Sequence, residues 1–184
     1  LGLDNIEIIQ GSILDYAPQN ATYDYIICHG VFSWVPEEVQ QGIFRICQQM
    51  MSENGIAVIS YNTLPGWSSI KSLREMMLWH TADYENPTVR TQQSIKLLEF
   101  IHGSQVDKNS PYCEIIESEL KHLDGKEISY VLHEYLEDNN TPCYLHEFVT
   151  QAAQHGLQYL ADNSLPQMYL GNQSPQVAKL LGQT

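Results

Sequence analysis

The chain has 184 residues, of which 43% are hydrophobic and 17% charged, a balance typical of a globular protein rather than a disordered one. Nine basic residues stand against 22 acidic ones, so the formal net charge is −13. Such a surface repels phosphate groups, which argues against nucleic acid and membrane surfaces as partners. No apolar run reaches the roughly 18 residues of a membrane helix, and no signal-peptide pattern is visible.

The four cysteines are scattered along the chain and form no C-x-x-C pair. Cys28 and Cys47 fall within apolar patterns, so we expect them to be small buried hydrophobic residues. Free thiols of this kind favour a reducing, cytoplasmic location. We expect no metal site, because His133-Glu134 lacks the second histidine of an H-E-x-x-H motif.

The first third of the chain predicts a parallel α/β sheet. Residues 37–51 place apolar side chains at helical spacing behind a proline, and the SENG sequence within residues 52–55 is expected to end this helix. Strands that are apolar on both faces and separated by helices are typical of parallel sheets covered on both sides. The expected strands are residues 6–9 (IEII), 23–28 (YDYIIC) and 56–61 (IAVISY).

The pattern after the third expected strand is mostly helical. Residues 126–137 are expected to be helical or irregular, and residues 157–161 and 167–171 are candidates for two final strands. This change of pattern divides the chain into residues 1–65, 66–143 and 144–184. The expected helices cover residues 68–81, 89–102, 112–123, 144–155 and 175–182.

Small or polar residues follow each of the three expected strands. Ligands of open parallel sheets bind beyond the carboxyl ends of the strands, so these residues form a candidate site. Glycine lets a ligand approach the backbone, and a histidine at a strand end can hydrogen-bond a ligand or act as a general base. The competing interpretation is that the glycines only make turns and the histidine is satisfied by nearby backbone. The residues are Gly11-Ser12-Ile13, His29-Gly30-Val31 and Tyr61-Asn62.

Two groups of sequences resemble a known family. NIEIIQGSILDY, YDYIICHGVFSWVP and GIAVISYN, in this order, resemble the second half of a class I S-adenosylmethionine-dependent methyltransferase. YNTLPGW, LHEYLEDNNTPCYLHEF and AAQHGLQYLADNS resemble the methyltransferases that carry a so-called regulatory domain after the fifth strand. The resemblance implies an α/β fold: a partial Rossmann-like parallel sheet with a mostly helical inserted or appended domain.

The resemblance also implies roles for individual residues. Ser12 stands where many class I enzymes have an aspartate, and a serine contact to adenine is uncharged and weaker. Tyr61 and Asn62 face the methyl acceptor, a small molecule or a protein, and His29 or Tyr61 is the candidate base. The implied catalytic residues are therefore His29, Tyr61 and Asn62. The implied residues around S-adenosylmethionine are Gly11, Ser12 and Ile13 at the adenine and His29, Gly30 and Val31 at the methionine moiety.

One part of the family pattern has no counterpart here. The glycine-rich G-x-G-x-G loop and the acidic residue that holds the ribose precede the third strand in the family, and this sequence begins almost at that strand. We therefore expect a fragment of a parent that extends roughly one hundred residues upstream, because each missing strand–helix unit is ~30 residues or more. Residues 6–9 then lack neighbouring strands and are left unpaired, disordered or swapped into a second molecule. We expect the fragment alone to be inactive.

Two other interpretations stay open. The segment is a non-catalytic helical interaction or regulatory module with a vestigial sheet, or it is another nucleotide-binding α/β enzyme. An intact G-x-G-x-G loop in the parent favours the methyltransferase over the module. The helical segment, with the polar cluster His133, Glu134 and Tyr135, is a lid, a substrate-selecting cap or a docking surface; the alternative is that these three residues cap helices and fill a local core.

Overall fold

The structure is a computed structural model that describes residues 2–16 and 22–183, and it divides into two compact units. The chain leaves the first unit after Ser60 and returns to it at Leu145, so the second unit is largely one continuous insertion. The first unit comprises Leu1–Phe32, Pro36–Ser60 and Leu145–Thr184, and the second comprises Ser33–Val35 and Tyr61–Tyr144.

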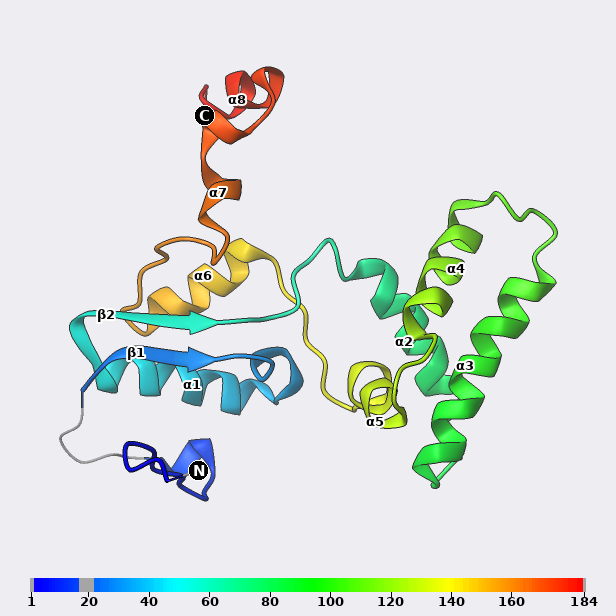
Figure 1. Cartoon of the computed structure of the whole chain (residues 1–184), viewed down its shortest axis with the longest axis horizontal. Coiled ribbons are helices and arrows are strands. Elements are labelled where there is room, and N and C mark those ends of the chain that lie inside the picture. Colours follow the sequence, from blue (N-terminus) through cyan, green and yellow to red (C-terminus); the bar gives the residue numbers. More distant parts are fainter. Residues whose placement is uncertain (1, 17–21, 184) are drawn as a thin grey trace. The chain divides into compact units, whose positions relative to one another are not determined.

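The first unit is built on two parallel strands. β1 (Tyr23–Cys28) pairs with β2 (Met51–Ile59), and Cys28 lies opposite Ile59 at the carboxyl ends. Helix α1 (Glu37–Met50) connects the two strands, as Figure 1 shows. This strand–helix–strand arrangement confirms the expected α/β class with a partial Rossmann-like parallel sheet.

Helix α1 forms where its periodicity predicts it. Acidic residues occupy its first turn, where the helix dipole favours them, and its apolar face is buried. A Cβ at Gly42 would lie 3.1 Å from Leu14 Cδ2, so the glycine lets the short 3-10 turn η1 (Ile13–Asp15) lie close to the helix. Arg45 Nη2 donates to the carbonyl oxygen of Leu14 at 2.9 Å and secures this contact.

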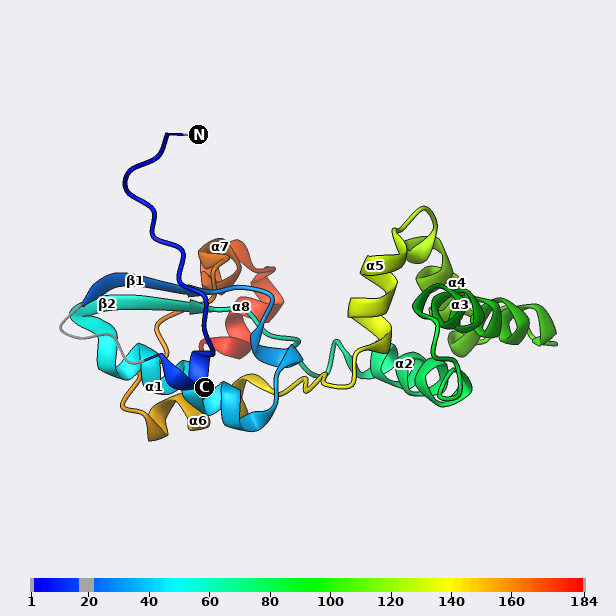
Figure 2. The same cartoon turned by 90° about the horizontal axis from the view of Figure 1, so that it is seen from below.

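An aromatic core joins α1 to helix α6 (Leu145–Gln154), which follows the second unit in the chain. The ring of Phe32 lies 5.2 Å from that of Phe44 on α1 and 5.3 Å from that of Phe148 on α6. Figure 2 shows α1 and α6 on the same side of the two strands. Phe32 is therefore a core residue.

The face of the sheet opposite α1 and α6 is exposed, contrary to the expectation. The side chains of Tyr25 and Ile27 on β1 are 70% and 72% exposed. The expectation that helices cover both faces is wrong for the described residues. An apolar strand shows only that both faces favour burial, and here α1 and α6 pack on one face alone.

Residues 6–9 form no strand, as expected for a segment that lacks neighbouring strands, and Ile8 is 92% exposed. The remaining differences also concern strands. The SENG sequence lies within β2, where the pairing register shifts and a Cβ at Gly55 would lie 3.0 Å from the Tyr23 carbonyl oxygen. The two expected final strands are absent: residues 157–161 are irregular, and helix α7 (Leu165–Met168) and turn η4 (Leu170–Asn172) precede helix α8 (Pro175–Leu181). Residues 17–21 of the first connection lie outside the described residues.

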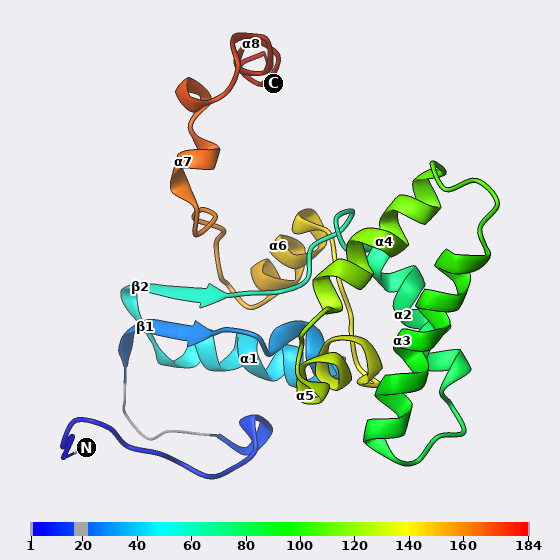
Figure 3. The ribbon, with the colours of Figure 1, turned by 45° about the vertical axis from the view of Figure 1, so that its right-hand side comes forward.

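The second unit is helical. Figure 3 shows its three long helices side by side, and α3 packs against both α2 and α4. Asn86 and Ser110 cap the N-termini of α3 and α4, each followed by a proline at the first helical position. The elements are α2 (Ser68–His80), α3 (Pro87–Ser104), α4 (Pro111–Leu123), α5 (Ile128–Val131) and the π-helical turn η3 (Leu132–Leu136). They enclose a core of Leu73, Met77, Leu98, Ile116, Leu123, Val131, Tyr135 and Leu136.

Candidate functional site

The carboxyl ends of β1 and β2 lie side by side in the first unit. The backbone N–H of Ser60 donates to the carbonyl oxygen of Cys28 at 3.0 Å, and the N–H of Gly30 donates to Ser60 Oγ at 2.8 Å. Gly30 has φ +70°, a left-handed conformation that favours glycine. The serine hydroxyl therefore fixes the turn after β1. Sequence reasoning missed Ser60, whose only signal is a small hydroxyl residue at the end of an apolar run.

His29 lies exposed at the end of β1, followed by the half-buried Val31. Within residues 2–16 and 22–183, no hydrogen bond to the His29 ring is found. This argues against the interpretation that nearby backbone satisfies the ring. The imidazole is thus able to contact a ligand at the edge where the parallel strands end.

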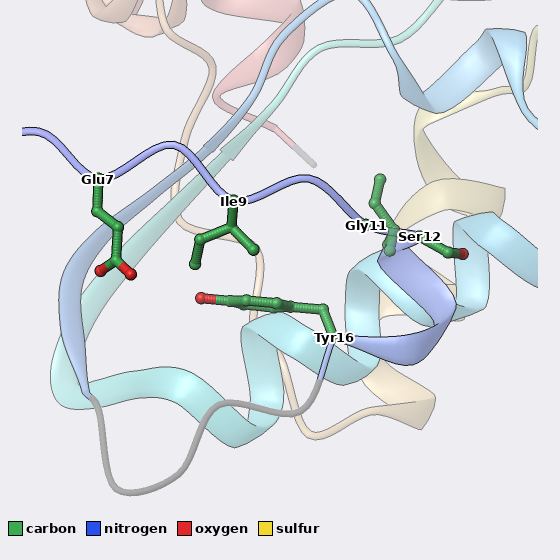
Figure 4. A pocket seen from close by; sticks show the side chains of 6 residues that line it. Glu7, Ile9, Gly11, Ser12 and Tyr16 are labelled. Carbon is green, nitrogen blue, oxygen red and sulfur yellow. The ribbon is translucent and has the colours of Figure 1, made fainter.

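Three of the predicted site residues line a hollow at the N-terminal segment of the first unit. Gly11, Ser12 and Ile13 enclose a volume of about 280 Å³ with Glu7, Ile9 and Tyr16 (Figure 4). The ring of Tyr16 lies flat below Ile9, and its hydroxyl end points toward the side of Glu7. Aromatic, apolar and carboxylate groups together suit a planar polar ligand. Ser12 Oγ also accepts from the N–H of Leu14 at 3.2 Å, so it caps η1.

Three sequence segments, residues 33–35, 61–67 and 133–143, meet in the second unit, and we call this place the three-segment junction. The main-chain oxygen of Ser33 accepts from the N–H of Thr141, and Ser33 Oγ accepts from the N–H of Asn62, both at 2.8 Å. Ser33 is 1% exposed, so these bonds are shielded from water. Two of the motifs that carry the family resemblance past the sheet, YNTLPGW and most of LHEYLEDNNTPCYLHEF, therefore meet in this junction.

Asn62 is held on several sides within this junction. Its carbonyl oxygen accepts from the N–H of Cys143 at 3.1 Å, and its Nδ2 donates to Asn140 Oδ1 at 3.4 Å. Tyr61, the residue before it, is half-buried, and its carbonyl oxygen accepts from Thr63 Oγ1 at 3.5 Å. The predicted acceptor-facing pair thus lies in the second unit, and Asn62 connects two of its segments.

Aromatic rings cover one side of the junction. The rings of Trp34 and Trp67 lie 6.0 Å apart in an edge-to-face arrangement, and the ring of His133 lies 4.6 Å from that of Trp34. His133 is exposed and belongs to η3, and π-helical turns are frequent at functional sites. Trp67 and His133, which are far apart in the sequence, therefore both lie against the ring of Trp34, and the sequence alone did not indicate this.

The other two residues of the predicted polar cluster turn toward the helices. Tyr135 is buried, and its hydroxyl donates to the carboxylate of Glu119; burial, followed by that bond, raises the pKa of Tyr135. Glu134 is half-buried, and burial raises its pKa above the ordinary value. The local-core interpretation is therefore confirmed for Tyr135.

Cys47 is a buried cysteine of the first unit. Burial, with a smaller contribution from Cys28, raises the pKa of the Cys47 thiol to about 11, which makes it an unreactive core group. Within the described part of the chain, no group of three or more histidine, cysteine or acidic residues could hold a metal ion. None of the helices described is both long and apolar enough to span a bilayer.

Comparisons with known proteins agree with this geometry. Residues 127–184 match the model of a predicted methyltransferase regulatory domain. The uncharacterized protein RP789 of Rickettsia prowazekii is 46% identical over 181 residues, which are 98% of this chain and 33% of that protein. The uncharacterized protein RP028 of the same organism is 42% identical over 150 residues, 82% of this chain and 60% of that protein.

A solved structure is also similar to this chain. The structure of PKMT2 from Rickettsia typhi in complex with AdoHcy matches 97% of this chain and 34% of that protein, with 40% sequence identity and a TM-score of 0.80. The chain spans about a third of the length of RP789 and of PKMT2. These comparisons confirm the predicted resemblance to methyltransferases that carry a regulatory domain, and residues 127–184 match the model of that domain.

Proposed function

We propose that this chain is part of an S-adenosylmethionine-dependent methyltransferase that acts on a small-molecule or protein acceptor in the cytoplasm. The observation that carries the proposal is the match of 97% of the chain to PKMT2 in complex with AdoHcy. AdoHcy is the product that S-adenosylmethionine becomes when it has given up its methyl group. The four cysteines, all among the described residues, form no disulfide, which supports the reducing location.

The predicted site residues have distinct roles in this proposal. Gly11, Ser12 and Ile13 hold the adenine in the hollow beside Tyr16, and Ser12 contributes a hydroxyl that already accepts from Leu14. His29, Gly30 and Val31 border the methionine moiety. The left-handed turn at Gly30, fixed by Ser60, keeps side-chain atoms away from that place.

Tyr61 and Asn62 orient the acceptor. S-adenosylmethionine supplies a methyl group that leaves with its bonding electrons remaining on sulfur when an acceptor lone pair attacks in line. The protein then has to align the acceptor and, for an acceptor that carries a proton, remove that proton through His29 or Tyr61. No nucleophilic side chain is required. The bonds to Ser33, Asn140 and Cys143 hold Asn62 in one position within the second unit.

We further propose that the 184 residues alone are inactive, because they contain no counterpart of the glycine-rich loop. The test uses a longer protein that contains this chain, with S-adenosylmethionine labelled in its methyl group and separate pools of small molecules and proteins as acceptors. Labelling of one pool, reduced by Tyr61→Phe and unchanged by Tyr112→Phe, is the expected result. Absence of labelling in both pools would overturn the proposal.

A second function has one observation in its favour. The second unit is compact and has its own buried core, as expected of an interaction or regulatory module. If the module is the function, a longer protein carries no intact cofactor loop and does not bind S-adenosylmethionine. The labelling experiment therefore decides between the two.

A further inference from the structure

The last part of the chain, residues 157–183, adds nothing to the buried core, and we call it the C-terminal segment. The structure describes all of these residues, and none of them is buried. Single exposed apolar side chains are ordinary on a protein surface, whereas a dense group of them marks a surface that contacts another molecule. The exposed large apolar residues of the segment, between 40% and 73% accessible, are Leu160, Leu165, Met168, Tyr169, Leu170, Val177, Leu180 and Leu181.

Local hydrogen bonds give the C-terminal segment its shape. Asn172 Nδ2 donates to the carbonyl oxygen of Pro166 at 2.8 Å, and Gln173 Nε2 donates to that of Gln167 at 2.7 Å. Helices α7 and α8 both pack against η4, but they are only four and seven residues long. Helices this short are marginal in water without a surface to pack on. The segment therefore needs a further surface to keep one structure.

The C-terminal segment contains an apolar hollow. Its volume is about 460 Å³, within the roughly 300–1,000 Å³ of sites that hold a ligand. The backbone N–H of Asp162 donates to Met168 Sδ at 3.0 Å and holds this side chain at the wall. The hollow thus offers space for an apolar side chain of another surface. It is lined by Ala161, Leu165, Met168, Tyr169, Leu170 and Gly171.

Charge indicates which kind of surface fits this hollow. The chain has nine basic and 22 acidic residues, yet the C-terminal segment contains only Asp162 and Lys179. The centre of a protein interface is depleted in charge and enriched in tyrosine and methionine, and Tyr169 and Met168 line the hollow. The matching surface is therefore an apolar, uncharged surface of a protein.

The same polypeptide can supply that surface. The chain matches about a third of the length of RP789 and of PKMT2, so about two thirds of each lies outside the match. A surface tethered in the same polypeptide has a high effective concentration, which a second copy or a separate protein lacks. We propose that the C-terminal segment docks on an apolar, uncharged surface of a longer protein, outside these 184 residues, and that an apolar side chain of that surface fills the hollow. This docking does not depend on S-adenosylmethionine or on methyl transfer.

Leu170→Asp tests the docking when it is made in two proteins, the 184 residues alone and a longer protein that contains them. In the 184 residues the side chain is already exposed, so the thermal unfolding temperature should stay unchanged. In the longer protein the same carboxylate is placed against an apolar surface, and the unfolding temperature should fall by several degrees. The matched control is Gln176→Asp, which adds the same charge to the segment at an exposed position outside the hollow and should have little effect in either protein.

Amide hydrogen exchange of the two unsubstituted proteins provides a second measurement that needs no variant to fold. Exchange over residues 160–172 should be ~10-fold or more slower in the longer protein than in the 184 residues, at every protein concentration. Equal exchange in the two proteins would overturn the proposal, and so would an equal effect of Leu170→Asp in both. Protection that appears only as the concentration rises would assign the hollow to a second copy and would also overturn it.

Discussion

Substitution of Ser33 tests the three-segment junction directly. Ser33 Oγ accepts the N–H of Asn62 at 2.8 Å and is shielded from water, whereas the main-chain bond from Thr141 does not depend on the side chain. Ser33→Ala removes one acceptor and leaves the Asn62 N–H without a partner. A buried donor left unsatisfied costs about 1–3 kcal/mol, and the half-burial of Asn62 places the expected loss near the lower end.

The assay is urea unfolding followed by tryptophan fluorescence, because Trp34 is the next residue in the chain. Amide hydrogen exchange at Asn62 provides a local measurement, and it should become faster in the variant. The matched control is Ser72→Ala, an exposed serine on α2 whose hydroxyl donates to the Ser69 carbonyl oxygen. A stability change within about 0.5 kcal/mol of the wild type, with unchanged exchange at Asn62, would refute the account of the junction.

Three further predictions concern the core, the pH response and association. Phe44→Ala should lower the unfolding free energy by about 3–5 kcal/mol, because it empties the aromatic core, whereas the exposed Phe100→Ala should cost little in chemical denaturation. Burial raises the folded-state pKa of Glu134 above its value in the unfolded chain. The contribution of Glu134 to stability is therefore present at low pH and is lost as the pH rises through the folded-state pKa. Glu134→Gln should flatten this part of the curve of stability against pH, and an unchanged curve would contradict the prediction. The exposed apolar side chains of Tyr25 and Ile27 should make the chain self-associate in sedimentation experiments, and lysine at both positions should reduce association; a monomer at all concentrations would contradict this.

Local signals predicted the helices well. Residues 37–51 were expected to be helical from the spacing of apolar side chains, and α1 ends only one residue earlier. The expected helix at 68–81 is α2 (Ser68–His80), and Gly156 takes the left-handed conformation of a helix end, with φ +70°. Helices contain their own hydrogen-bond partners, so their sequence carries most of the information that they need.

Strands were predicted less well for the opposite reason. Residues 6–9 have a β-rich sequence, but a strand depends on a neighbour that the segment itself cannot supply, and they are unpaired as expected. At residues 167–171, Met168 ends helix α7 and Leu170 begins a 3-10 turn, although Tyr169 and its neighbours are strand-forming in type. Apolar composition alone does not distinguish a short strand from a short helix.

The candidate site was predictable only in part. The strand ends were expected from the position of His29 and Gly30 after an apolar run, and the structure places them at the carboxyl edge of the sheet beside Ser60. The bonds of Ser33 to Asn62 and Thr141 join residues far apart in the chain, and nothing local indicates them. Tertiary contacts of this kind require the fold before they can be seen.

The most direct measurement is calorimetry of AdoHcy binding, performed on a longer protein that contains this chain and on the 184 residues alone. The account predicts saturable binding by the longer protein, weakened by Gly30→Val at the left-handed turn, and none by the shorter chain. Failure of the longer protein to bind would contradict the assignment as a methyltransferase. Equal binding by both would contradict the claim that the missing cofactor loop is required.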